Sequence, residues 1–166
     1  MDILIAFYSK TGSTEKVALA LQRFFAKGHK VTLFKVKPVE ELKAGEYKKS
    51  EKDIPLVEPL PSLGEFDLVL VGTPVWGFCP CPIIVSYLRK LQNIKGKRFA
   101  LFATCTVLPG TTIKRMGNIL ATAGATVVDS LTIKSIFELD SEKMRPVEKF
   151  AQKLLQQALG ENAKKK

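Results

Sequence analysis

Residues 3–18 read ILIAFYSKTGSTEKVA and join two different patterns in one short stretch. The first six residues form a continuous apolar run, which is typical of a β-strand buried on both faces. A loop of small and hydroxyl-bearing residues follows, and residues 14–26 then repeat apolar side chains with the 3.6-residue period of an amphipathic helix. A buried strand that leads through a short loop into a helix predicts a parallel sheet with helical crossings.

The same alternation of strand and helix continues along the chain. Further strand-like runs lie at residues 30–36, 66–72, 98–103 and 126–133, and further helical patterns lie at residues 83–91, 112–123 and 146–159. The runs at 30–36 and 126–133 alternate more clearly between apolar and polar residues, as edge strands do. Pro146 is expected at the start of the last helix and Gly160 at its end. The fold class predicted is α/β, a doubly wound sheet of five parallel strands with helices on both faces.

Residues 37–65 interrupt this regular alternation. The segment contains Pro38, Pro55, Pro59 and Pro61, and only residues 39–42 are compatible with a helix. We therefore expect a mostly irregular crossing with at most one helical turn, and a loop of that length is often functional or mobile.

Composition limits the class of protein. The 166 residues suit one domain, and 46% apolar content with 25% charged residues excludes global disorder. No run of about 18 apolar residues occurs, so no membrane-spanning helix is expected, and the N-terminus lacks the pattern of a signal peptide. Three cysteines do not make a disulfide framework and suit a reduced, cytoplasmic location.

The net charge of +10 is unevenly distributed. Residues 1–83 carry 11 basic and 10 acidic side chains, a net charge of +1, whereas residues 84–166 carry 15 and 6, a net charge of +9. Such a basic chain raises the possibility of a nucleic-acid or anionic-lipid partner. No zinc-finger spacing or aromatic RNA-binding stripe accompanies the charge, and the basic run at 164–166 has the character of a solvated tail.

The loop at residues 9–15 is the first candidate for a binding site. It combines Ser9, Thr11, Ser13 and Thr14 with Gly12 directly before a helix. Unpaired amides and the partial positive charge at a helix N-terminus bind phosphate, and hydroxyl groups add further hydrogen bonds. The spacing differs from those of a P-loop and of a dinucleotide-binding glycine motif. The alternative is simple capping of the helix by Thr11 or Ser13.

Residues 8–18, YSKTGSTEKVA, resemble the phosphate-binding fingerprint of the flavodoxin family, and residues 72–77, GTPVWG, resemble the second flavin loop of that family. The resemblance extends over nearly the whole chain. It implies a sheet of order 2-1-3-4-5 and non-covalent binding of FMN. The domain organisation implied is a flavodoxin-like FMN-binding domain at residues 1–160 with a basic C-terminal tail at 161–166.

The resemblance also implies the residues that bind the cofactor. They fall into three loops: Ser9, Lys10, Thr11, Gly12, Ser13 and Thr14; Thr73, Pro74, Val75, Trp76 and Gly77; and Thr104, Cys105, Thr106 and Gly110. Trp76 is expected to stack on the flavin ring, with a core tryptophan as the alternative, and Lys10 is expected to point outward. The third loop lacks the acidic residues and the second aromatic residue typical of the family. That difference puts a two-sided aromatic sandwich in doubt and predicts that full reduction of the flavin is easier than in acidic flavodoxins.

Cys79, Cys81 and Cys105 follow neighbouring strands and are expected near one edge of the sheet. They could act as a thiol partner to the flavin, a metal site or a redox sensor, or simply pack as small residues. Their spacing matches no metal-binding pattern, and no metal site is predicted. His29, the one histidine, is expected in a surface turn at the opposite edge.

The leading function predicted is an FMN-binding redox protein that carries electrons between protein partners. The alternative is an NAD(P)H-dependent FMN or quinone reductase on the same fold, and a third possibility is a flavin-free binding module for nucleic acid or anionic lipid. Because the charge of the chain is positive, acidic redox partners are expected, with no nucleic acid and no membrane span.

Overall fold

The computed structural model describes residues 1–43, 53–134 and 141–164. The elements in chain order are β1 (Asp2–Phe7), α1 (Ser13–Phe25), β2 (Lys30–Lys35), β3 (Leu68–Trp76), β4 (Cys79–Pro80), α2 (Pro82–Lys90), β5 (Arg98–Cys105), α3 (Thr112–Thr122), β6 (Thr126–Lys134) and α4 (Ser141–Lys164).

Five of the strands form a parallel sheet of order β2-β1-β3-β5-β6. Counted along the chain without β4, this is the predicted order 2-1-3-4-5, which is confirmed. The two-residue strand β4 pairs antiparallel with the end of β3 and was not predicted. The strand order reverses between β1 and β3, which is where open α/β sheets place their ligand crevice.

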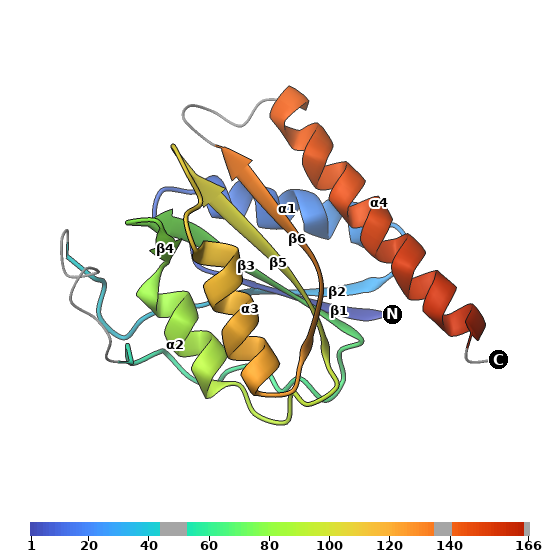
Figure 1. Ribbon diagram of the computed structural model, residues 1–166, viewed down its shortest axis with the longest axis horizontal. Helices are drawn as coiled ribbons and strands as arrows, with labels where there is room; N and C mark the ends of the chain where they lie inside the picture. The colour runs from blue at the N-terminus through green and yellow to red at the C-terminus, as the bar shows by residue number, and fades with distance from the viewer. Residues whose placement is uncertain (44–52, 135–140, 165–166) are drawn as a thin grey trace.

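Helices cover both faces of the sheet, with α1 and α4 on one face and α2 and α3 on the other (Figure 1). Ile3 and Ile5 of β1 belong to a cluster with buried residues of α1 and α4, whereas Leu4 and Ala6 belong to a cluster with α2 and α3. Because successive side chains of a strand point to opposite faces, the continuous apolar run of β1 supplies both cores. The outer strands β2 and β6 are only partly buried, as their alternating patterns predicted.

The strand β3 continues beyond its predicted end at Gly72. Gly72 pairs with Phe102 of β5, and a Cβ atom at this position would overlap the Phe102 ring. The glycine therefore provides room for a fully buried aromatic ring in the middle of the sheet, and it does not end the strand. Pairing with β5 and β4 extends β3 to Trp76, so the residues predicted as a second loop begin as strand.

The described part of residues 37–65 is irregular, as predicted, and residues 39–42, which the sequence left compatible with one helical turn, form none. An antiparallel bridge joins Pro38 to Leu56 instead, and Leu56 and Leu63 are buried against the core. The two ends of the crossing are therefore held by packing and by a bridge. Residues 44–52 lie outside the described part of the chain.

The last helix is longer than predicted. It begins at Ser141, so Pro146 lies inside it, and it continues past Gly160 to Lys164. A buried stripe from Val147 to Ala158 packs on the sheet, and this packing outweighs the hydrogen bond that a proline removes and the cost of a helical glycine. The segment assigned to the basic tail is therefore helical as far as Lys164. None of the described helices has the length and hydropathy needed to cross a membrane.

Candidate functional site

The loop that follows β1 enters α1 through an open helix start. The Gly12 amide donates to Ser9 Oγ at 3.1 Å, and the Gly12 carbonyl accepts the first helical bond from Lys16 at 2.9 Å. Gly12 is the N-cap residue with φ of 94°, and no side chain caps the helix there. Because glycine readily adopts positive φ, the backbone can turn sharply into the helix and leave its first amides accessible to an anion. Thr11 is exposed, and Ser13 is half-buried.

Thr14 ties this helix start to the end of β5. Its hydroxyl lies 2.7 Å from the hydroxyl of Thr104, and both side chains are almost fully buried. The two residues come from the first and third predicted loops, 90 positions apart in the sequence. Their contact joins the first and third predicted loops at the carboxyl edge of the sheet.

The second predicted loop is a hairpin. Thr73, Pro74, Val75 and Trp76 belong to β3, and only Gly77 and Phe78 form the turn to β4. Both turn residues have positive φ, 57° and 64°, which matches the twist of tight hairpins. The Thr73 hydroxyl donates to the Pro74 carbonyl at 2.9 Å and accepts from the Cys81 amide at 3.1 Å.

Trp76 is the last residue of β3 and is half-buried, with part of its surface packed against the core under α2 and α3 and part exposed. It meets Tyr8 edge to face, with 5.7 Å between the ring centres and an angle of 89°. The ammonium of Lys10 stands 5.7 Å from the centre of the indole ring and donates to the Leu42 carbonyl at 3.1 Å. Lys10 is exposed, as expected, but it leans across Trp76 and does not extend away from the site.

Residues 41–42 form a wall of the site that the sequence did not reveal. The Tyr8 hydroxyl donates to Glu41 Oε2 at 2.8 Å, and burial together with this carboxylate raises the pKa of Tyr8. Tyr8 is the aromatic residue of the quoted fingerprint and could have been singled out from it. Glu41 is 33 residues away in an irregular segment, and no sequence pattern links the two.

The third predicted loop, like the second, begins inside a strand: Thr104 and Cys105 belong to β5, and Thr106 and Gly110 follow it. Thr104 and Cys105 are buried at the end of β5, whereas Thr106 is exposed beyond it. Gly110, with φ of 56°, packs so closely on Phe78 that a Cβ atom would overlap its backbone carbonyl. The Thr111 amide also donates to that carbonyl at 2.9 Å, which fixes this loop against the hairpin.

The three cysteines differ in environment. Cys79 is half-buried with its sulfur 3.7 Å from the Thr111 hydroxyl, whereas Cys81, the N-cap residue of α2, is fully buried in the core. Burial raises the pKa of Cys81 to about 11. Burial also raises the pKa of Cys105, and the charge of Lys134 opposes this shift. Both buried groups are therefore neutral thiols near pH 7. Among the described residues, no group of three potential ligands could hold a metal ion.

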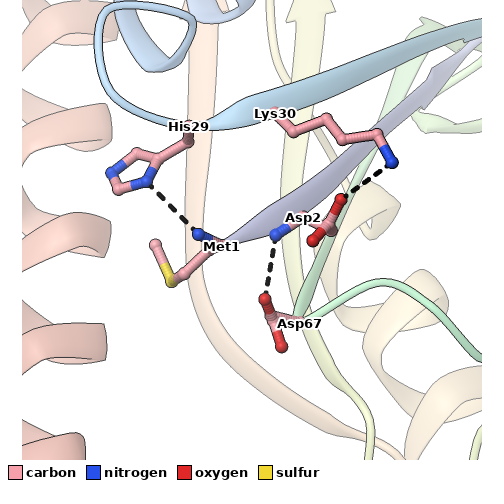
Figure 2. Close-up of polar contacts among 5 residues, drawn as sticks. All are labelled: Met1, Asp2, His29, Lys30 and Asp67. Atoms are coloured by element: carbon pink, nitrogen blue, oxygen red, sulfur yellow. Dashed lines mark hydrogen bonds and ion pairs between the residues drawn. The ribbon is translucent and has the colours of Figure 1, made fainter.

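His29 lies in the turn before β2, at the amino edge of the sheet, as predicted (Figure 2). Its Nδ1 is 3.5 Å from the terminal amine of Met1. Nearby, Lys30 pairs with Asp2 at 3.3 Å, and the Asp2 amide donates to Asp67 at 2.8 Å. These contacts anchor the start of β1 at the edge opposite the candidate site.

Comparison with solved structures finds the same architecture in flavin proteins. A flavoprotein from Lactobacillus acidophilus in complex with FMN superposes with a TM-score of 0.65 and 21% identity over 79% of this chain and 92% of that chain. A Streptococcus pneumoniae flavodoxin gives 0.64 and 18% over 95% and 99%. The two-electron reduced flavodoxin of Megasphaera elsdenii gives 0.60 and 19% over 90% and 98%.

Comparison with family models and with curated protein sequences found no match. At this level of identity, the structural likeness establishes the fold. The protein has the flavodoxin-like α/β fold, and its candidate site occupies the carboxyl edge of that fold, where β1, β3 and β5 end.

Proposed function

We propose that the protein binds FMN and carries electrons between redox protein partners. The observation that carries the proposal is the pairing, at one edge of the sheet, of the uncapped start of α1 with the half-buried indole of Trp76. The first feature suits a phosphate dianion and the second suits a flat apolar ring. The FMN complex and the reduced flavodoxin among the structural neighbours support this assignment.

The three loops that would hold FMN all follow strands that end at the same edge of the sheet. The phosphate would be held by the loop of Ser9, Lys10, Thr11, Gly12, Ser13 and Thr14, and the ring by the residues around Trp76. Thr73 to Gly77 and Thr104, Cys105, Thr106 and Gly110 would border the ring. The flavin supplies the redox chemistry, and the chain binds it, orients it and sets its electrostatic environment.

That environment is basic. No acidic residue occurs between Asp67 and Asp129, whereas seven lysines and arginines do. The loops after β3 and β5 carry no carboxylate, and Glu41, which accepts a hydrogen bond from Tyr8, contributes an acidic group to the site from another segment. We expect the lack of carboxylates in these two loops to favour the negatively charged, fully reduced flavin, so the second reduction potential should be less negative than in acidic flavodoxins. The same charge favours acidic partners. The three free thiols suit a reducing compartment such as the cytoplasm.

The direct experiment is reconstitution with FMN followed by absorption and fluorescence. Binding should produce the visible bands of an oxidised flavoprotein and quench the emission of Trp76, the one tryptophan in the chain. Trp76→Leu should weaken FMN binding about tenfold or more, because it removes the stacking surface. Phe24→Leu removes a half-buried ring of α1 away from the site and should leave affinity unchanged. Equal affinities in the two variants would refute the role of Trp76, and failure of the native chain to bind FMN would refute the proposal.

Electron transfer to an acidic [2Fe–2S] ferredoxin serves as a probe of the carrier role. The rate should fall as ionic strength rises, because salt screens the attraction between opposite charges. A rate that does not change with salt would leave the basic half of the chain without this role.

A reductase is the second candidate, and it is favoured by one observation. The first turn of α3 contains Lys114 and Arg115 and no acidic residue, which suits an anionic substrate such as NADPH. Stopped-flow mixing with NADH or NADPH separates the two functions. Fast loss of flavin absorbance indicates a reductase, and a stable spectrum indicates a carrier.

A further inference from the structure

We propose that Lys10 couples the two ends of the cofactor site and makes the protein selective for FMN over riboflavin. The Lys10 ammonium covers the indole of Trp76 in the ligand-free chain and moves to the phosphate when FMN binds, which uncovers the ring. This inference rests on the proposed function and assigns to Lys10 a role that the general requirements of FMN binding do not demand.

The present contacts of Lys10 are weak ones. Its ammonium is exposed, stands 5.7 Å from the centre of the Trp76 ring and donates to one neutral carbonyl, that of Leu42, at 3.1 Å. An exposed cation–π contact and a hydrogen bond to a neutral acceptor are each weaker than a charge-assisted hydrogen bond to a phosphate oxygen. A phosphate group arriving at the adjacent helix start therefore outcompetes both contacts.

The positive charge of Lys10 would stabilise a phosphate dianion at the start of α1. The Thr14 hydroxyl pairs with that of Thr104, and the Ser9 hydroxyl accepts from the Gly12 amide and keeps its own proton to donate. The hydroxyl groups of this loop can therefore offer a phosphate neutral hydrogen bonds, but they carry no positive charge. Glu15 adds a negative charge in the first turn of α1, but Lys35 pairs with it at 2.9 Å. Lys10 lies two residues before Gly12 and supplies the positive charge that a dianion lacks at this point.

The phosphate loop and the Trp76 ring are linked because Lys10 can contact either of them. FMN carries the phosphate that draws Lys10 off the indole. Riboflavin lacks the phosphate, so its ring must displace the ammonium from Trp76 with no compensating interaction. The native chain should therefore prefer FMN strongly. Lys10→Gln should weaken FMN binding about tenfold at low salt, whereas riboflavin binding stays the same or becomes tighter.

The first test uses the cofactor-free protein and inorganic phosphate. Trp76 emission should change on titration with phosphate at constant ionic strength, and Lys10→Gln should abolish the change. Lys27→Gln is the matched control, because Lys27 stands 5.8 Å from the Phe24 ring in an equivalent contact away from the site. No response in the native chain, or an equal response in Lys10→Gln, would overturn the proposal.

The second test compares dissociation constants for FMN and riboflavin. A selectivity ratio that drops at least severalfold in Lys10→Gln and returns in Lys10→Arg supports the coupling. A ratio unchanged by Lys10→Gln overturns it while leaving FMN binding as the function. If the native chain binds neither flavin, both proposals fail. Circular dichroism of each variant confirms that the exposed substitution leaves the fold intact.

Discussion

Replacement of Thr14 by valine tests the contact that joins the helix start to the end of β5. Thr14 and Thr104 share a hydrogen bond of 2.7 Å, and the two residues are 1% and 5% exposed. Valine has nearly the shape of threonine, so Thr14→Val removes the hydroxyl and leaves the packing largely as it is. Thr104→Val does the same from the other side.

The loss of unfolding free energy expected for these variants follows from the burial of the two hydroxyl groups. Each single substitution leaves one buried hydroxyl without its partner, which costs about 1–3 kcal/mol of unfolding free energy. The double variant leaves neither hydroxyl unpaired, and replacing both partners by apolar groups can be nearly neutral. The sum of the two single costs should therefore exceed the cost of the double variant by about 2 kcal/mol or more.

Urea denaturation of the cofactor-free protein measures these quantities. Trp76 emission reports unfolding near the site, and circular dichroism reports loss of the helices. Coincidence of the two transitions shows that unfolding is two-state and that the free energies are comparable. A single variant that loses about 2 kcal/mol should also melt about 4–8 °C lower.

A matched substitution provides the control. Thr122 lies at the end of α3 with an exposed hydroxyl that donates to the Asn118 carbonyl at 2.9 Å. Thr122→Val should cost less than about 0.5 kcal/mol, because water replaces the lost bond. If the two buried single variants cost no more than this control, or if their costs add in the double variant, the coupled hydroxyl pair is refuted.

Three further outcomes are expected. Gly72→Ala should lower the free energy of unfolding, measured in urea, by about 1–3 kcal/mol, because the new methyl group overlaps the Phe102 ring. Adding Phe102→Leu to the same chain should recover part of this loss. Full stability of Gly72→Ala would contradict the close packing. The free energy of unfolding should fall as the pH rises from about 9 to about 11, since burial raises the pKa of Cys81 from 9.0 to about 11. The neutral buried thiol contributes at most roughly 2–3 kcal/mol, and this contribution is complete only below pH 9. Cys81→Ala should therefore flatten this part of the pH profile. Iodoacetamide should modify half-buried Cys79 well before Cys81, and equal rates measured by mass spectrometry would argue against their different burial.

The exposed apolar side chains near the hairpin of β3 and β4 and after β5 bear on the doubt about a two-sided aromatic sandwich. Trp76 provides one wide aromatic face, whereas the loop after β5 presents Val107 and Leu108, which are 64% and 55% exposed. Phe78 at the hairpin tip is 57% exposed and is held by Gly110. The large exposed apolar side chains on this side are thus aliphatic except at the hairpin tip, as the sequence of the third loop had indicated.

The class of fold, and the edge of the sheet at which the candidate residues gather, could be predicted from the sequence. The continuous apolar runs of β1, β3 and β5 indicated strands buried on both faces, and the helical periods between them required crossings above and below the sheet. Because loops after parallel strands meet at one edge, Gly12, Trp76 and Thr104 could be assigned to a common region before any contact was known. The strand order came from the likeness of two motifs to a family.

Tertiary structure alone decided which side chains meet. The pairing of Thr14 with Thr104, the bond from Tyr8 to Glu41 and the position of Lys10 over Trp76 join segments far apart in the chain. Periodicity reports which face of an element is buried, but it does not report the neighbour across a gap or the direction of a flexible side chain. The neighbour of a side chain and the direction of a flexible one depend on how the whole sheet packs, which is why the contact of Lys10 with Trp76 could not be read from the sequence.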